Sequence, residues 1–316
     1  MDTNKHRAIF FPNAERAKLR AEHTENRFAY YTTAEVAYQI IKNKQIWMRN
    51  TTTMNDYMEV EYGQRLLLGS RNSPAWASLK EAIEKHHPGL FDESWNLLTA
   101  WLPGFRFDTF ITCVSEHDPS ENDFGRLSMW RAYGGKTGVA LVIDGAAFSL
   151  ESTTLGAYSS PVSYLTQDQF IASIAEVAEN IGSDPEYINS ISTNVLKNTL
   201  FNMFRFAVLA TKHPGFAEER ELRIIASPIM FPDALLKPEF AVVNGVPQPI
   251  LKISLEENPE HGLIGLAIPS LLKRVIIGPC AFPRVTYRAL WEVLEGAGVE
   301  DPSRILTESE IPLRHS

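Results

Sequence analysis

A central run of helical periodicity separates two parts of this chain that have the composition of strands. Apolar residues recur at helical spacing over 171–181 and again over 188–210. Thr166 and Gln169 have the spacing of a capping box at the start of this run. We therefore expect two core helices, packed antiparallel, as a helical insertion at about 166–212.

The rest of the chain alternates irregularly between strands and helices. Apolar, β-prone segments predict strands at 28–31, 45–48, 109–114, 138–143, 221–226, 239–243, 249–254 and 273–277. Helical spacing predicts helices over 34–41, 75–102 (broken at Pro88-Gly89) and 285–294. Because helices and strands do not alternate regularly, the fold class is α+β. We expect a mixed, largely antiparallel sheet core with flanking helices, in a single domain over 28–316 that follows an extended N-terminal lead-in over 1–27.

The composition excludes several classes of protein. A formal charge of −8, without a basic run, argues against an extensive nucleic-acid surface. No window of about twenty apolar residues and no secretory leader is present, so we expect a cytoplasmic protein without a membrane span. The two cysteines, Cys113 and Cys280, are far apart, which excludes a disulfide framework and a cysteine-ligated zinc site.

The segment 216–225 concentrates charge at the entrance of a predicted strand. Glu218, Glu219 and Glu221 stand beside Arg220 and Arg223, immediately before an apolar run. Carboxylates held at a strand entrance can serve as a general base or stabilise positive charge. The alternative is a network of ion pairs without catalytic function.

Other polar residues also fall at the ends of predicted strands, where clefts of sheet proteins commonly form. They are Tyr30, Tyr31 and Thr32, then Asn55, Asp56 and Glu59, then Ser115, and then Trp130 and Tyr133. The histidines show no metal-ligand spacing, and Glu84 with His87 forms only one copy of a motif that a dinuclear site needs twice. We therefore predict no metal, with a site of Asp56, Glu59 and Glu221 as the alternative.

Five segments together resemble a known bacterial family. They are Tyr31-Thr32-Thr33 with the following helix and strand, Met54 to Glu59, Phe110 to Ser115, Met129 to Val139, and Glu219 to Arg223. Val275 to Pro279 and Glu310 to Arg314 extend the likeness, which spans residues 28–314. The chain in this respect resembles domain-of-unknown-function family 2971, which is distantly similar to abortive-phage-resistance proteins.

A second resemblance implies a mechanism. An aromatic-Thr strand end, a short helix, a strand and a Glu-x-Glu pair at a later strand are similar to ADP-ribosyltransferase domains. The resemblance implies NAD as substrate, with Glu221 and Glu219 catalytic and with Tyr31, Thr32, Ser115, Trp130, Tyr133 and Arg223 binding it. In this sequence Tyr30 or Tyr31 stands where that superfamily has His or Arg at the end of the first strand.

Three functions follow as hypotheses. The first is an NAD-consuming transferase or glycohydrolase acting in phage defence or toxicity on an unidentified acceptor. The second is a non-catalytic sensor or interaction module of a defence system, in which Glu219 and Glu221 belong to an ion-pair network with Arg131, Arg220 and Arg223. The third is a metal-dependent nuclease or hydrolase.

Overall fold

The structure is a computed structural model that describes residues 2–23, 25–53, 59–149, 154–243 and 245–312. Its contacts group the chain into two compact units. The helical unit comprises Met1–Leu19, Asn50–Thr109 and Ser160–Ala217. The sheet unit comprises Arg20–Arg49, Phe110–Ser159 and Glu218–Ser316.

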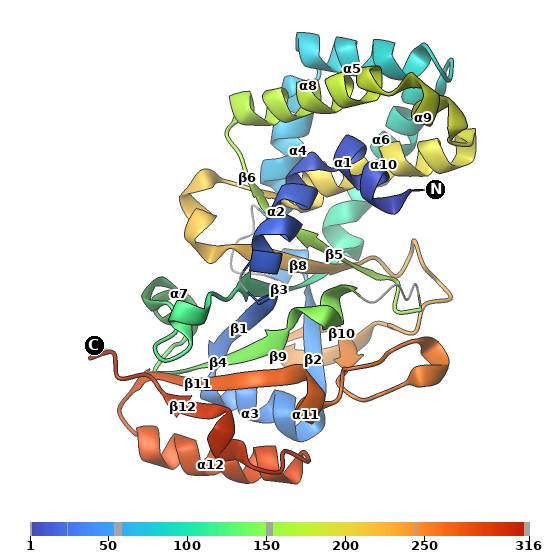
Figure 1. Ribbon diagram of the computed structural model, residues 1–316. Coiled ribbons are helices and arrows are strands. Elements are labelled where there is room, and N and C mark those ends of the chain that lie inside the picture. Colours follow the sequence, from blue (N-terminus) through green and yellow to red (C-terminus); the bar gives the residue numbers. More distant parts are fainter. Residues whose placement is uncertain (1, 24, 54–58, 150–153, 244, 313–316) are drawn as a thin grey trace. The chain divides into compact units, whose positions relative to one another are not determined.

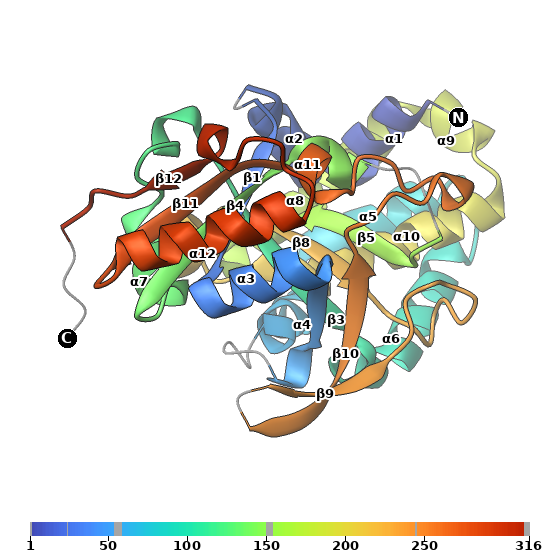
Figure 2. The ribbon, with the colours of Figure 1, turned by 90° about the horizontal axis from the view of Figure 1, so that it is seen from below.

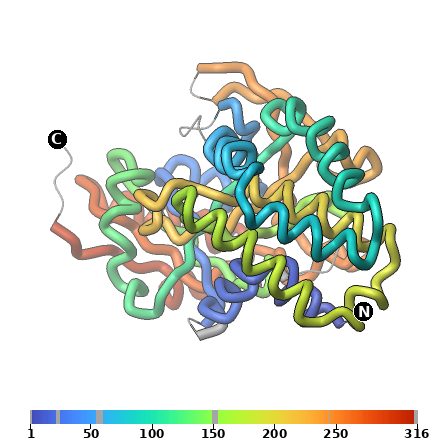
Figure 3. Tube along the Cα trace, turned by 90° about the horizontal axis from the view of Figure 1, so that it is seen from above, coloured from blue at the N-terminus to red at the C-terminus, as the bar shows by residue number. Residues whose placement is uncertain are grey.

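The helical unit is built from helices that bury aromatic side chains. Its helices are α1 (Thr3–Phe10), the start of α2 (Pro12–His23), α4 (Glu59–Ser70), α5 (Pro74–Glu84), α6 (Leu90–Asp108), α8 (Gln167–Ser183), α9 (Pro185–Ser190) and α10 (Thr193–Leu209). Two short strands, β6 (Ser163–Tyr164) and β7 (Thr211–Lys212), pair in parallel. Figure 3 shows α5 and α8 running side by side, while α10 packs on α4 and α6. Trp76, Phe91 and Phe204 form the aromatic core.

The predicted helical insertion is confirmed, with two differences. Thr166 and Gln169 form the predicted capping box of α8. The second helix is interrupted, because Ile191 is extended and Ser192 starts a new helix, α10. The helices α8 and α10 also pack mainly on other partners, since α4, α5 and α6 supply apolar faces that the sequence did not assign to them.

The prediction of an extended segment over 1–27 is wrong for most of its length. Asp2 accepts hydrogen bonds from the backbone N–H groups of Asn4 and Lys5 and so caps α1. In α1, His6, Ile9 and Phe10 are buried against α8 and α10. Tertiary packing of one apolar face thus stabilises a helix whose polar composition gave no clear signal.

The sheet unit confirms the α+β class and the largely antiparallel sheet. Its main strands are β1 (Arg27–Thr33), β2 (Gln45–Asn50), β3 (Phe110–Glu116), β4 (Thr137–Asp144), β8 (Glu221–Ala226), β9 (Glu239–Val243), β10 (Val246–Ser254), β11 (Leu272–Cys280) and β12 (Leu306–Glu308). The strand order is β12-β11-β4-β1-β3-β2-β10-β9, and β8 pairs with β3 and with β5 (Ala157–Pro161). The pairs of β1 with β3 and β4 and of β3 with β8 are antiparallel, whereas β11 and β12 are parallel.

Two hydrophobic clusters cover the two faces of this sheet. On one face lie α3 (Ala34–Asn43) and α12 (Pro283–Gly296), which Figure 2 shows side by side. Phe28 of β1 belongs to this larger cluster, and its neighbours Ala29 and Tyr31 belong to the smaller cluster on the other face. The short helix α7 (Leu127–Tyr133) contributes Met129 and Trp130 to that smaller cluster. The α7 face therefore carries Tyr31, Trp130 and Tyr133 among the polar residues that the sequence singled out at strand ends.

The remaining organisation stays a prediction. Compact units defined by contacts need not fold independently, so the single domain over 28–316 is not tested by them. None of the described helices is long and apolar enough to cross a membrane.

Candidate functional site

Pairing in the sheet brings Ser115 and Glu221 to one face of the sheet unit. Ser115 of β3 is opposite Glu221 of β8 and opposite Ala29 of β1. Directly paired residues of antiparallel strands point to the same face. The two strand ends that the sequence indicated as parts of one site therefore lie next to each other, on the α7 face.

The carboxylate of Glu219 joins this group through Tyr133. The Tyr133 hydroxyl donates a hydrogen bond to Glu219 Oε1 at 2.8 Å. The Ser115 hydroxyl donates to the backbone carbonyl of Glu219. Burial, together with the negative charge of Glu219, raises the pKa of Tyr133, so this phenol stays protonated and can donate. Glu219 is half-buried, and its side chain is oriented by a neutral donor.

Glu221 has a different environment. Its side chain is 6% exposed, and its Oε2 lies 3.3 Å from Nη2 of Arg223, which is 0% exposed. A buried carboxylate in this position compensates a buried guanidinium. The geometry favours a structural ion pair for Glu221. It also leaves Arg223 enclosed, away from any ligand in solution.

Trp130 is a core residue on the α7 face. It is 1% exposed, its ring meets that of Tyr31 edge-on with centroids 4.8 Å apart, and its indole N–H donates to the Phe124 carbonyl at 2.8 Å. A Cβ added at Gly138 or Gly278 would approach the Trp130 ring to within 3 Å. The indole therefore has no free face on which a planar ligand could stack.

Tyr31 and Thr32 do not join the site in the expected way. Tyr31 is buried, and its hydroxyl accepts a hydrogen bond from the backbone N–H of Arg126 at 2.9 Å. Thr32 follows Tyr31 in β1, and the alternation of side chains assigns it to the opposite face of the sheet. The resemblance implied one ligand-binding set, and the structure brings together Ser115, Tyr133, Glu219 and Glu221 from it, with Arg223 paired to Glu221 in the interior.

Arg126 is the central residue of the site, and the sequence analysis did not identify it. Its Nε and Nη2 donate to the two carboxylate oxygens of Glu121 at 2.9 and 3.0 Å. The other contacts of the guanidinium are with Ser115 Oγ at 2.8 Å and with the carbonyls of Glu218 at 2.7 Å and Glu116 at 2.7 Å. It thereby joins the ends of β3 and β8. The available signal was the Asp-x-x-Glu spacing of Asp118 and Glu121, which form a capping box.

His117 supports the same loop from within. It is 0% exposed, and its Nε2 lies 3.0 Å from Asn122 Oδ1, which makes Nε2 the donor. Its Nδ1 has no hydrogen-bond partner within the described part of the chain and lies 3.8 Å from Glu121 Oε2. Burial is the main cause that lowers the pKa of His117 below its usual 6.5.

This lowered pKa predicts a pH dependence of stability. The unfolded chain binds a proton at His117 more readily than the folded chain, so acid favours unfolding. We expect the stabilisation to be complete above about pH 6.5 and to be lost as the pH falls toward 5. Urea unfolding at several pH values between 7 and 5 measures this slope in the wild type and in His117→Gln. The slope should be smaller in the variant, and equal slopes would contradict the prediction.

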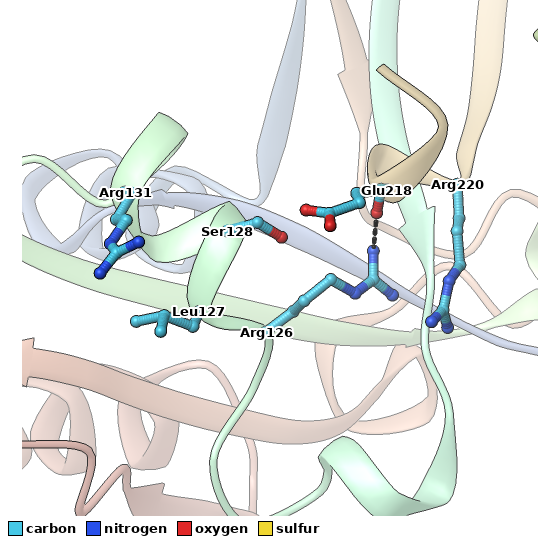
Figure 4. Close-up of a pocket in the computed structure, with 6 residues that line it drawn as sticks. All are labelled: Arg126, Leu127, Ser128, Arg131, Glu218 and Arg220. Atoms are coloured by element: carbon cyan, nitrogen blue, oxygen red, sulfur yellow. Dashed lines mark hydrogen bonds between the residues drawn. The ribbon is translucent and has the colours of Figure 1, made fainter. Parts of the chain in front are cut away.

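A pocket of about 440 Å³, lined by the two chain neighbours of Glu219, is here called the arginine pocket. Its lining residues are Arg126, Leu127, Ser128, Arg131, Glu218 and Arg220. Figure 4 shows Arg131 toward one end and Arg220 toward the other, with the Arg126 guanidinium bonded to the Glu218 carbonyl between them. The pocket combines three guanidinium groups with one carboxylate.

The metal hypothesis finds no support in the described residues. Among them, no group of three or more His, Cys, Asp or Glu side chains is arranged to hold a metal ion. Asn55 and Asp56 lie outside the described residues. A site of Asp56, Glu59 and Glu221 therefore stays a prediction.

Comparison with known proteins gives one finding. No curated protein and no solved structure matches the chain significantly. A family model does match part of it, from α7 through β8, a range that includes Tyr133, Glu219 and Glu221. Residues 129–224 are thus similar to the family described as protein of unknown function (DUF2971), which supports the family resemblance and assigns no activity.

Proposed function

We propose that this chain is an ADP-ribosyltransferase-like enzyme that consumes NAD. The observation that carries the proposal is the oriented carboxylate of Glu219, which accepts from Tyr133 at 2.8 Å. The neighbours of Glu219 in the chain, Glu218 and Arg220, line a pocket of about 440 Å³. The biological setting that the resemblance implies, phage defence or toxicity, belongs to the proposal, as does the cytoplasmic location.

The proposed reaction is cleavage of the bond between nicotinamide and the ribose C1′. Nicotinamide leaves with the bonding electron pair, so positive charge develops on the ribose. A carboxylate held in place near C1′ stabilises that charge without reorganising. Water or an acceptor then bonds to C1′ and loses a proton, for which Glu219 is the nearest base in the proposal. With water, NAD gives ADP-ribose, nicotinamide and one proton.

The test is nicotinamide release from NAD by the purified full chain. We expect Glu219→Gln to lower kcat by about 10²–10⁴, since a neutral amide neither stabilises the charge nor accepts the proton. Tyr133→Phe should lower kcat by about tenfold, because Glu219 keeps its charge and loses its orientation. The matched control is Glu300→Gln, an exposed carboxylate outside the site, which should leave the rate unchanged.

Two results would contradict the proposal. One is the absence of nicotinamide release with water and with a panel of protein and nucleic-acid acceptors. The other is release that Glu219→Gln leaves unchanged. Glu221→Gln belongs in the same series, because the resemblance implies a catalytic Glu221 and its burial beside Arg223 favours a structural one.

A specific observation also favours the second candidate, a non-catalytic sensor. Glu221 and Arg223 neutralise each other in the interior, and Arg126 joins both strand ends through carbonyl groups. Both features stabilise a binding site without chemistry. Binding of NAD or ADP-ribose with no turnover, in calorimetry on the same protein, would identify this function.

A further inference from the structure

Three arginines line the arginine pocket, and one of them has no donor left for a ligand. A guanidinium carries five N–H groups. Those of Arg126 meet both oxygens of Glu121, the Ser115 hydroxyl and the carbonyls of Glu218 and Glu116. Arg126 therefore forms part of the wall and contributes charge, while its hydrogen bonds are used within the protein.

The other two arginines keep donors toward the pocket. Arg131 is exposed on α7 and makes no hydrogen bond or ion pair with any residue that the structure describes. Arg220 has a side chain that is 46% exposed, and Nη1 lies 3.5 Å from Glu121 Oε1, a distance at which the pairing is weak. The hydroxyl of Ser128, between them in Figure 4, is an additional donor.

The backbone at Arg220 gives an independent indication of function. Its φ of 44° lies in the left-handed region, where a side chain costs free energy that glycine does not. This conformation turns the chain between Glu219 and the start of β8. Strained non-glycine residues concentrate at binding and catalytic sites, so the left-handed backbone of an arginine that lines the pocket points to a functional role for Arg220.

We propose that the arginine pocket binds the diphosphate group of a nucleotide, with Arg131 and Arg220 as its phosphate-binding residues. The planar donor fork of arginine matches phosphate oxygens. The two guanidiniums stand toward opposite ends of the pocket in Figure 4, and a diphosphate offers a phosphate group to each of them. Arg126, Arg131 and Arg220 against Glu121 and Glu218 leave a local charge of +1 in a chain of −8. The inference rests on the proposed function only for the identity of the nucleotide as NAD.

The experiment is calorimetric titration of the full chain with inorganic pyrophosphate and with ADP-ribose, with adenosine as the uncharged probe. We expect Arg131→Gln and Arg220→Gly to weaken binding of both anions about tenfold or more, because each variant loses charge-assisted hydrogen bonds. Glycine suits the backbone at 220, so that variant keeps the fold. Glu218→Gln should tighten pyrophosphate binding about threefold by removing a repulsive charge. Adenosine should bind no more than weakly.

The control is Arg284→Gln, an exposed arginine of α12 away from the pocket, which should leave pyrophosphate affinity unchanged. No pyrophosphate or ADP-ribose binding up to about 10 mM, or equal affinity in wild type and Arg131→Gln, would overturn the proposal. Anion binding that needs Arg131, in a protein that does not release nicotinamide, supports the pocket and contradicts the NAD-consuming function. Nicotinamide release with a KM for NAD that Arg131→Gln leaves unchanged would support the NAD-consuming function. It would contradict the arginine pocket as the phosphate-binding site.

Discussion

Replacing Arg223 with methionine is expected to lower the free energy of unfolding by about 3–5 kcal/mol, because the change removes the guanidinium that lies 3.3 Å from the buried Glu221 carboxylate. The two side chains are 0% and 6% exposed, and their closest charged atoms are 3.3 Å apart, so solvent does little to screen the loss. Methionine fills much of the volume of arginine, which limits the contribution of a cavity. Urea unfolding followed by circular dichroism measures the change.

A double-mutant cycle separates the pair from the individual residues. The single variant Glu221→Gln should also destabilise, since it removes the carboxylate that lies 3.3 Å from the buried Arg223 guanidinium. The double variant Glu221→Gln with Arg223→Met should recover a large part of the loss, because it removes both charges of the buried pair together. Full additivity of the two single changes, or a Glu221→Gln protein as stable as the wild type, would show that Glu221 does not serve this ion pair.

This outcome bears on the candidate site as well as on stability. If the cycle shows strong coupling, Glu221 has a structural role at the start of β8. Glu219 is then the carboxylate available for catalysis. The two readings of the charged segment, catalysis and ion pairing, then apply to different residues of the same Glu-x-Glu pair. The two residues differ because Glu221 lies in β8, whereas Glu219 ends the short helix before it and the left-handed backbone of Arg220 redirects the chain between them.

Local sequence signals predicted the elements that depend on neighbours in the chain. Thr166 with Gln169 caps α8, as the spacing of these two side chains indicated. The positions of Ser115 and Glu221 at strand ends were likewise indicated, whereas the pairing of their two strands was not. Such features are set by spacing and by β-propensity, which a sequence shows directly.

Features that depend on distant residues were not predictable in this way. Arg126 binds the backbone carbonyl groups of Glu116 and Glu218. Because every residue has a backbone carbonyl, the residue types in a sequence do not indicate such a contact. Trp130 was expected to contact a ligand, and it is enclosed instead because Gly138 and Gly278 allow backbone to approach its ring. The burial of an aromatic residue thus depended on glycines far from it in the sequence.

A second large effect is expected at Gly63 of α4. A Cβ at this position would lie 2.2 Å from the carbonyl oxygen of Val208 and 2.9 Å from that of Ala207, both in α10. These atoms belong to helix backbone, so the contact cannot be relieved by turning a side chain. We expect Gly63→Ala to lower the free energy of unfolding by about 2–3 kcal/mol, even though alanine favours a helix, because α4 and α10 must move apart. Urea unfolding of the wild type and of Gly63→Ala measures this change in the free energy of unfolding.

The same helix supplies the control. Gly69 lies in the last turn of α4, and a Cβ there would meet nothing within 4 Å. Gly69→Ala should therefore raise the free energy of unfolding by about 0.5–1 kcal/mol, through helix propensity alone. If Gly63→Ala lowers the free energy of unfolding and Gly69→Ala raises it, the close approach of the α4 and α10 backbones is the reason for glycine at position 63. Similar effects of the two changes would mean that α4 and α10 are not packed through Gly63.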